Sequence, residues 1–201
     1  MNGHKAFALT SRLLHWLMAV LILVMLFVGL FMASSVGPAY HGLVSFHRSL
    51  GLVIFVLVGL RLVNRWIHPP PPLPQGLPAL MAFMATVSHW ALYALMIALP
   101  LVGWAMLSAG GYPIPVFGNA FLLPPILPHD AALWGWLRLA HTVLAFTLFA
   151  LVMAHSGAAL FHFLIRRDGV MQSMIHSDTT LPDRECRNRA SRIRPSTIPH
   201  G

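Results

Sequence analysis

Residues 137–157 read LRLAHTVLAFTLFALVMAHSG, an apolar stretch of 21 residues with a histidine near each end. An α-helix rises about 1.5 Å per residue, so this stretch is long enough to cross roughly 30 Å of membrane hydrocarbon. His141 and His155 are 14 residues apart, which places them about 21 Å apart along the helix and within about 40° of the same face. The stretch predicts a transmembrane helix with one histidine near each side of the bilayer.

The composition of the whole chain is typical of a membrane protein. Of its 201 residues, 57% are hydrophobic and only 9% are charged, whereas soluble domains carry about 25% charged residues. Three further apolar stretches are long enough to span a bilayer. We therefore expect an all-α integral membrane protein, a four-helix bundle within residues 1–175 with spans at about 13–33, 46–67, 82–107 and 137–165.

Basic residues predict the orientation, because Lys and Arg near the ends of spans stay in the cytoplasm. One end of the predicted bundle carries Lys5, Arg12, Arg61, Arg65 and seven Arg after residue 165. The other end has only Arg48 and Arg138. Both termini are therefore expected in the cytoplasm, with residues 176–201 as a disordered Arg-rich tail. The net charge of +8 does not indicate nucleic-acid binding, because the basic residues flank apolar stretches instead of forming one patch.

Five of the twelve histidines lie at membrane depth, where ionisable side chains are costly and usually functional: His15, His47, His89, His141 and His155. Depth pairs His15 with His155 near the cytoplasmic side, and His47 with His141 near the outer side. Two facing imidazole pairs suit two six-coordinate haems. The second ring nitrogen of each ligand then needs a partner, most simply a carbonyl one turn earlier. The alternative for any one histidine is an interhelical hydrogen bond.

Small residues beside the histidines would leave room for a wide, flat macrocycle. Ser49 and Gly51 follow His47, and Ser156, Gly157 and Ala158 follow His155.

The acidic residues indicate which chemistry is less favoured. All five follow position 129, so the first three spans contain no carboxylate. Proton relays and cation sites usually use carboxylates. The pattern favours haem over a histidine-based metal transporter, which stays open as a less favoured alternative.

Taken in order, these motifs resemble those of the bacterial cytochrome b561 family, four-helix dihaem membrane cytochromes related to the b-type subunits of nickel hydrogenases. The resemblance covers residues 8–175. It rests on Arg12-Leu-Leu-His15-Trp16, His47-Arg-Ser-Leu-Gly51 with Arg61, His89-x-x-x-Tyr93 with Leu99-Pro100-x-x-Gly103, and the series His141, His155 and His162. It implies that His15, His47, His141 and His155 ligate the irons of two non-covalent haem b groups, in the pairing that depth predicts. Arg12, Arg61 and His89 are expected around the haems.

The resemblance also implies electron transfer across the bacterial inner membrane, from a periplasmic reductant to ubiquinone near the cytoplasmic side. Some members oxidise superoxide, so a superoxide:quinone oxidoreductase is the leading expectation, with Arg48 and Arg138 attracting the anion. His162 lies seven residues beyond His155, on nearly the same face, and is a candidate to bind a quinone carbonyl. Gln75 is a second candidate, because it is the one polar side chain between residues 69 and 78, where the family has a basic residue.

A further alternative keeps the same cofactors. The protein would then be the cytochrome b subunit of a larger complex, passing electrons between quinol and a partner redox protein. The sequence does not exclude this alternative.

Overall fold

The computed structural model describes residues 8–35, 37–69, 78–166 and residue 174. Four long helices dominate these residues: α1 (Leu9–Ser34), α2 (Ala39–Ile67), α3 (Ala79–Ala109) and α4 (Ala131–Phe161). A π-helical turn, η1 (His162–Arg166), continues α4. Each long helix is apolar and long enough to cross a membrane. The first three predicted spans lie within α1, α2 and α3, and the fourth lies within α4 and η1 together.

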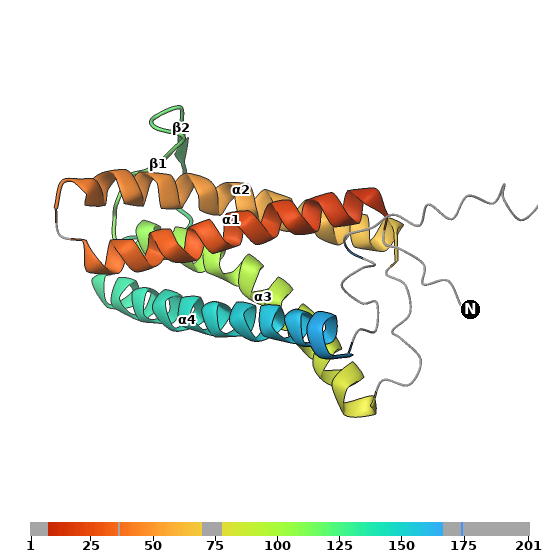
Figure 1. Ribbon diagram of the computed structural model, residues 1–201. Coiled ribbons are helices and arrows are strands. Elements are labelled where there is room, and N and C mark those ends of the chain that lie inside the picture. Colours follow the sequence, from red (N-terminus) through yellow and green to blue (C-terminus); the bar gives the residue numbers. More distant parts are fainter. Residues whose placement is uncertain (1–7, 36, 70–77, 167–173, 175–201) are drawn as a thin grey trace, which may run out of the picture.

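The helices run up and down, so that chain segments alternate between two ends of the bundle. Figure 1 shows the start of α1 and the end of α4 at one end, together with the end of α2 and the start of α3. Residue 75 and residues 176–201, for which a quinone contact and a disordered tail are expected, lie outside the described residues.

The outer surface of the bundle is apolar, as a lipid environment requires. Phe31 in α1 and Val143 in α4 are 58% and 55% exposed. Trp66 and Trp136 lie near opposite ends of the bundle and are 80% and 71% exposed. Tryptophan is enriched at both membrane–water interfaces, so these two side chains agree with helices that cross the bilayer.

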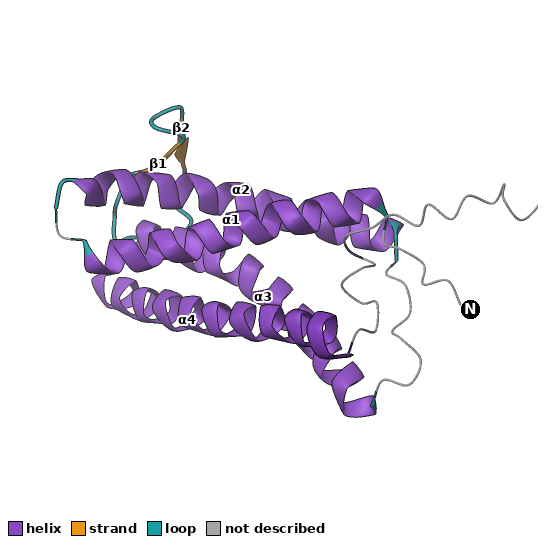
Figure 2. Ribbon diagram, viewed as in Figure 1, coloured by secondary structure: helices purple, strands orange, loops and turns teal. Residues whose placement is uncertain are grey.

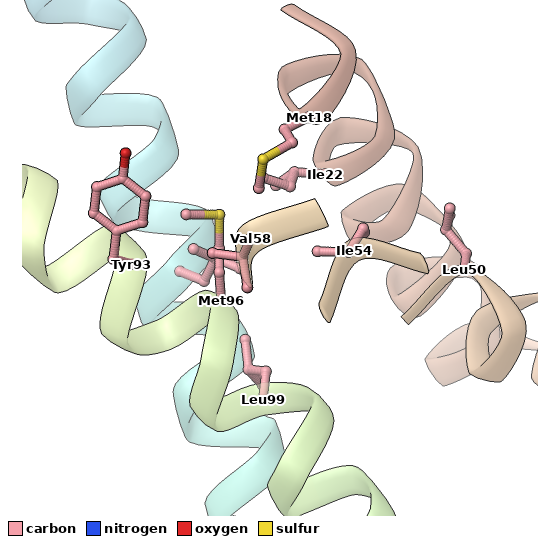
Figure 3. Packing of buried hydrophobic residues seen from close by; sticks show 9 residues of the cluster. Met18, Ile22, Leu50, Ile54, Val58, Tyr93, Met96 and Leu99 are labelled. Carbon is pink, nitrogen blue, oxygen red and sulfur yellow. The ribbon is translucent and has the colours of Figure 1, made fainter. Parts of the chain in front are cut away.

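The helices form two close pairs, α1 with α2 and α3 with α4, which are joined mainly through α2 and α3. Their shared core is a cluster at mid-depth, which we call the apolar layer: Met18, Ile22, Leu50, Ile54, Val58, Tyr93, Met96, Leu99 and Leu148. Figure 3 shows members of the layer from α1, α2 and α3 converging on the centre of the bundle. Leu148 lies seven residues from both His141 and His155. The apolar layer therefore separates the two depths at which the predicted histidine pairs lie.

A small hairpin that the sequence analysis did not predict lies between α3 and α4 (Figure 2). Strand β1 (Ile114–Val116) pairs antiparallel with β2 (Phe121–Leu123). Residues 117–120 form the loop between the paired strands, with positive φ at Phe117 (53°) and Gly118 (71°) and a bond of 3.3 Å from the amide of Ala120 to the carbonyl of Phe117. The amide of Phe117 donates to Ser49 Oγ in α2 at 2.8 Å. Ile114 and Val116 are buried, so the hairpin closes over the neighbouring ends of α2 and α3.

The junctions beside the hairpin are fixed by polar contacts. Gly111 has a φ of 70°, which glycine adopts without strain, and it allows the chain to leave α3. His129 Nδ1 and the Asp130 amide both donate to the carbonyl of Ala109. The Asp130 carboxylate then accepts from the amide of Leu133 and caps α4. These contacts set where α4 begins and therefore where its histidines lie.

Candidate functional site

The outer histidine pair lies inside a large apolar cavity. His47 on α2 and His141 on α4 face each other with ring centroids 6.2 Å apart and ring planes at 66°. Both line a cavity of about 530 Å³ that all four helices and the hairpin bound. Cofactor pockets typically measure about 300–1,000 Å³ and are mostly apolar. The cavity therefore has the size and lining of a cofactor site.

The ring spacing fits one metal ion shared between the two imidazoles. A bond of about 2.0 Å from nitrogen to metal on each side, with each ring centre about 1.1 Å behind its nitrogen, gives a separation of roughly 6 Å. The observed separation is 6.2 Å. Nδ1 of His47 and Nδ1 of His141 are buried without a hydrogen-bond partner. The expectation that a carbonyl one turn earlier accepts from them is wrong for both, because no such bond forms.

Two glycines on facing helices allow these rings their positions. A Cβ atom at Gly103 in α3 would lie 3.3 Å from Cε1 of His141, and one at Gly29 in α1 would lie 3.7 Å from Cε1 of His47. Carbon atoms pack best at about 3.5–4.0 Å. Gly103 therefore accommodates a close approach of the His141 ring that alanine would crowd.

The inner pair lies at the other end of the bundle. His15 on α1 and His155 on α4 have ring centroids 6.3 Å apart, with ring planes at 74°. His89 on α3 lies beside them, 5.3 Å from His155. Its Nδ1 donates to the carbonyl of Ala85, one turn earlier, at 2.6 Å. The inner site thus holds a ring pair with nearly the spacing of the outer pair and a third imidazole next to it.

A cation links two helices at the inner pair. Arg61 on α2 donates from Nη2 to Nδ1 of His15 at 3.1 Å and from Nε to the hydroxyl of Tyr93 at 3.0 Å. A carbonyl one turn earlier was expected to accept from His15 Nδ1, but a guanidinium donates to this atom instead. In this arrangement a neutral His15 ring carries its proton on Nε2. The sequence motif contained Arg61 and Tyr93, but nothing in it indicated that the two side chains meet.

The two outer arginines differ in environment. Arg48 lines the outer cavity with His47, and its Nη1 donates to the carbonyl of Pro113 at 3.4 Å. Arg138 is exposed on α4, with its guanidinium 5.3 Å from the centre of the Trp134 ring.

Two further predicted residues lie near the inner end. Nε of Arg12 donates to the carbonyl of Met174 at 3.2 Å. His162 is half-buried at the first residue of η1. The structure therefore brings His15, His155, His89 and Arg61 together by direct contacts.

One small residue has a different role from the one expected. The Ser49 hydroxyl accepts from the amide of Phe117 and donates to the carbonyl of Ser45. Ser49 therefore fastens the hairpin to α2, whereas Gly51 does line the cavity. Sequence reasoning missed Gly29 as a neighbour of His47, because it examined the residues that follow each histidine and not those on facing helices.

The arrangement of the two histidine pairs does not indicate a site for a bare metal ion. Among the described residues, no three His, Cys, Asp or Glu side chains are grouped so that they could hold a metal ion. Haem needs only two protein ligands for each iron, because the porphyrin supplies four nitrogens. The donor set fits haem.

Comparison with known proteins gives one consistent result. A model of the prokaryotic cytochrome b561 family matches residues 6–177. The chain is 32% identical over 177 residues to cytochrome b561 homolog 2 of Escherichia coli (strain K12), covering 87% of this chain and 93% of that protein. It is 27% identical over 173 residues to the probable superoxide oxidase CybB of Yersinia pestis, covering 86% and 97%. It is 28% identical over 173 residues to cytochrome b561 homolog 1 of Escherichia coli (strain K12), covering 84% and 96%.

The family match covers most of the chain and includes all four helices and both histidine pairs. The apolar helices and the imidazole pairs are the features that a membrane cytochrome needs. The chain belongs to the prokaryotic cytochrome b561 family, and it is a multi-pass membrane protein with b-type haem that transfers electrons.

Proposed function

We propose that this protein holds two haem b groups and transfers electrons from superoxide on the periplasmic side to ubiquinone near the cytoplasmic side. The observation that carries the proposal is the presence of two histidine pairs, with ring centroids 6.2 and 6.3 Å apart, on opposite sides of the apolar layer. Each pair has the spacing for one iron, and the two pairs together span the bundle.

In this proposal the four histidines would hold the two haem irons. His47 and His141 would hold the outer iron, and His15 and His155 would hold the inner iron, each through a neutral imidazole nitrogen. For His15 to bind through Nε2, its proton has to move to Nδ1 and Arg61 has to turn away from that atom. When bound, haem supplies a centre that accepts and donates one electron at a time. The apolar layer keeps water out between the sites, so the protein contributes ligation, spacing and a low dielectric.

At the outer end, the proposed substrate is an anion and the nearby protein charges are positive. Arg48 lies in the cavity wall, and Arg138 is exposed on α4, three residues before His141. Positive potential raises the rate at which an anion reaches a site, and salt weakens this effect. The relative from Yersinia pestis that is named a probable superoxide oxidase supports this choice of substrate.

At the inner end, the proposed acceptor is ubiquinone. His162 begins a π-helical turn, a distortion that frequently occurs at functional sites, and it is seven residues beyond His155. In this proposal His162 donates a hydrogen bond to a carbonyl oxygen of the quinone, and Gln75 is the second candidate contact. The excess of Lys and Arg at this end supports a cytoplasmic orientation of both termini in the bacterial inner membrane.

The first test is spectroscopic and uses the purified protein from haem-sufficient cells. The visible spectrum should show b-type bands with two haems per chain. His141→Ala should lose one haem, whereas the control His41→Ala, an exposed histidine at the same end, should keep both. Two haems retained in His141→Ala would refute the pairing.

The second test is kinetic. Mixing the oxidised protein with superoxide should reduce the haems, and added ubiquinone should reoxidise them. If superoxide fails to reduce a protein that contains both haems, superoxide is not the donor, and the alternative of a cytochrome b subunit with a separate redox partner takes its place.

A further inference from the structure

Helix α2 carries two half-buried arginines, and each has one buried nitrogen without a hydrogen-bond partner. Within the described residues, four buried side-chain nitrogens have no partner. Two of them are the ring nitrogens of His47 and His141 discussed above. The other two are Nε of Arg48 and Nη1 of Arg61.

Neither arginine has a counter-charge in the part of the chain that the structure describes. The only carboxylate there belongs to Asp130, and it caps α4 by accepting from the amide of Leu133. The groups that Arg48 and Arg61 do contact are neutral: a backbone carbonyl for Arg48, and a phenol and an imidazole for Arg61. A buried guanidinium nitrogen without a partner is costly, and at membrane depth more so.

The two arginines are distributed one to each histidine pair. Arg48 follows His47 directly and lines the same cavity. Arg61 is 14 residues beyond His47, which is the spacing of His141 and His155 on α4. It therefore lies within about 40° of the His47 face and at the depth of the inner pair, where it contacts His15.

We propose that Arg48 and Arg61 each bind a carboxylate of the haem held by the neighbouring histidine pair. The inference rests on the proposed haem sites and adds the groups that recognise the edge of the macrocycle. A guanidinium presents its donors in a planar fork that matches a carboxylate, and such charge-assisted bonds are among the strongest in proteins. The haem carboxylate then supplies the anion that the helices lack.

The first arm of the test measures how fast haem leaves the purified protein for an excess of an apo-globin acceptor. Arg48→Gln and Arg61→Gln should each lose one of the two haems on the order of tenfold faster than the unmodified protein. Arg48→Lys and Arg61→Lys keep the charge and should fall between. The controls are Arg138→Gln and Arg65→Gln. The native Arg138 is exposed, and the guanidinium of the native Arg65 lies over the rings of Trp90 and Tyr93. Both controls should lose haem at the unmodified rate.

The second arm identifies the anion. The protein is stripped of haem and refilled with haem dimethyl ester, in which both carboxylates are blocked. For the ester, the Gln variants should bind at least as tightly as the unmodified protein, because no carboxylate remains to pair with the arginine. If Arg48→Gln and Arg61→Gln weaken the ester as much as native haem, the arginines act through another anion, such as a lipid phosphate, and the inference is overturned.

The outcomes separate the inference from the function on which it rests. Absence of b-type bands in the unmodified protein would refute the proposed haem sites. Two haems with unchanged loss rates in both Gln variants would refute the carboxylate contacts and leave the haem sites standing. A Gln variant that fails to fold is replaced by the Lys variant, whose loss rate must still exceed that of the controls.

Discussion

Gly103→Ala should selectively weaken the outer haem. The added Cβ would lie 3.3 Å from Cε1 and 3.5 Å from Nδ1 of His141, so the ring has to move by a few tenths of an ångström. Crowding of this kind costs about 1–3 kcal/mol. Because a factor of ten corresponds to about 1.4 kcal/mol, haem should leave the outer site about 5- to 150-fold faster.

The assay is haem transfer from the purified protein to an apo-globin acceptor, followed in the visible spectrum. Gly29→Ala is the matched control, because its Cβ would lie 3.7 Å from Cε1 of His47, an ordinary contact. Its rate should stay within about twofold of the unmodified protein. Equal rates for the two alanine variants would refute the reasoning, since the His141 ring would then not depend on the missing side chain at Gly103.

Two further predictions concern the hairpin and the start of α4. Ser49→Ala removes the acceptor of the Phe117 amide and should lower the free energy of unfolding by about 1 kcal/mol, with faster hydrogen exchange in the hairpin. The control is Ser34→Ala, because the Ser34 hydroxyl bonds to carbonyls of its own helix; this variant should change neither quantity. A similar loss of stability in both variants would contradict the role assigned to Ser49. Asp130→Ala removes the cap on the amide of Leu133 and should cost about 1 kcal/mol, measured as a lower Tm in detergent; an unchanged Tm would argue against the cap.

The sequence was sufficient to predict the four helices because membrane thickness fixes a minimum apolar length. Helical periodicity also placed His141 and His155 on one face, and depth suggested their partners, which the structure does bring into proximity. The hairpin was missed because its strands are only three residues long. The local signal was present in Gly118-Asn119, which follows an apolar segment and precedes another.

Contacts across helices could not be predicted from one sequence. Arg61 and Tyr93 are 32 positions apart, and their meeting depends on how α2 and α3 are rotated about their axes. The same rotation brings Gly103 against His141. Periodicity states which residues share a face, but it does not state which faces of two helices meet.

The apolar layer makes the proposed electron transfer sensitive to membrane voltage. The two histidines of α4 are separated by about 21 Å, roughly two-thirds of the hydrocarbon thickness, and no carboxylate lies between them to carry a compensating proton. An electron moving from the outer to the inner pair then carries uncompensated charge toward the negative side of an energised membrane. At 100 mV this opposes transfer by about 1.6 kcal/mol. At this voltage the transfer is downhill only if the inner haem holds an electron more tightly than the outer one by more than this amount, and dissipating the voltage should accelerate the transfer.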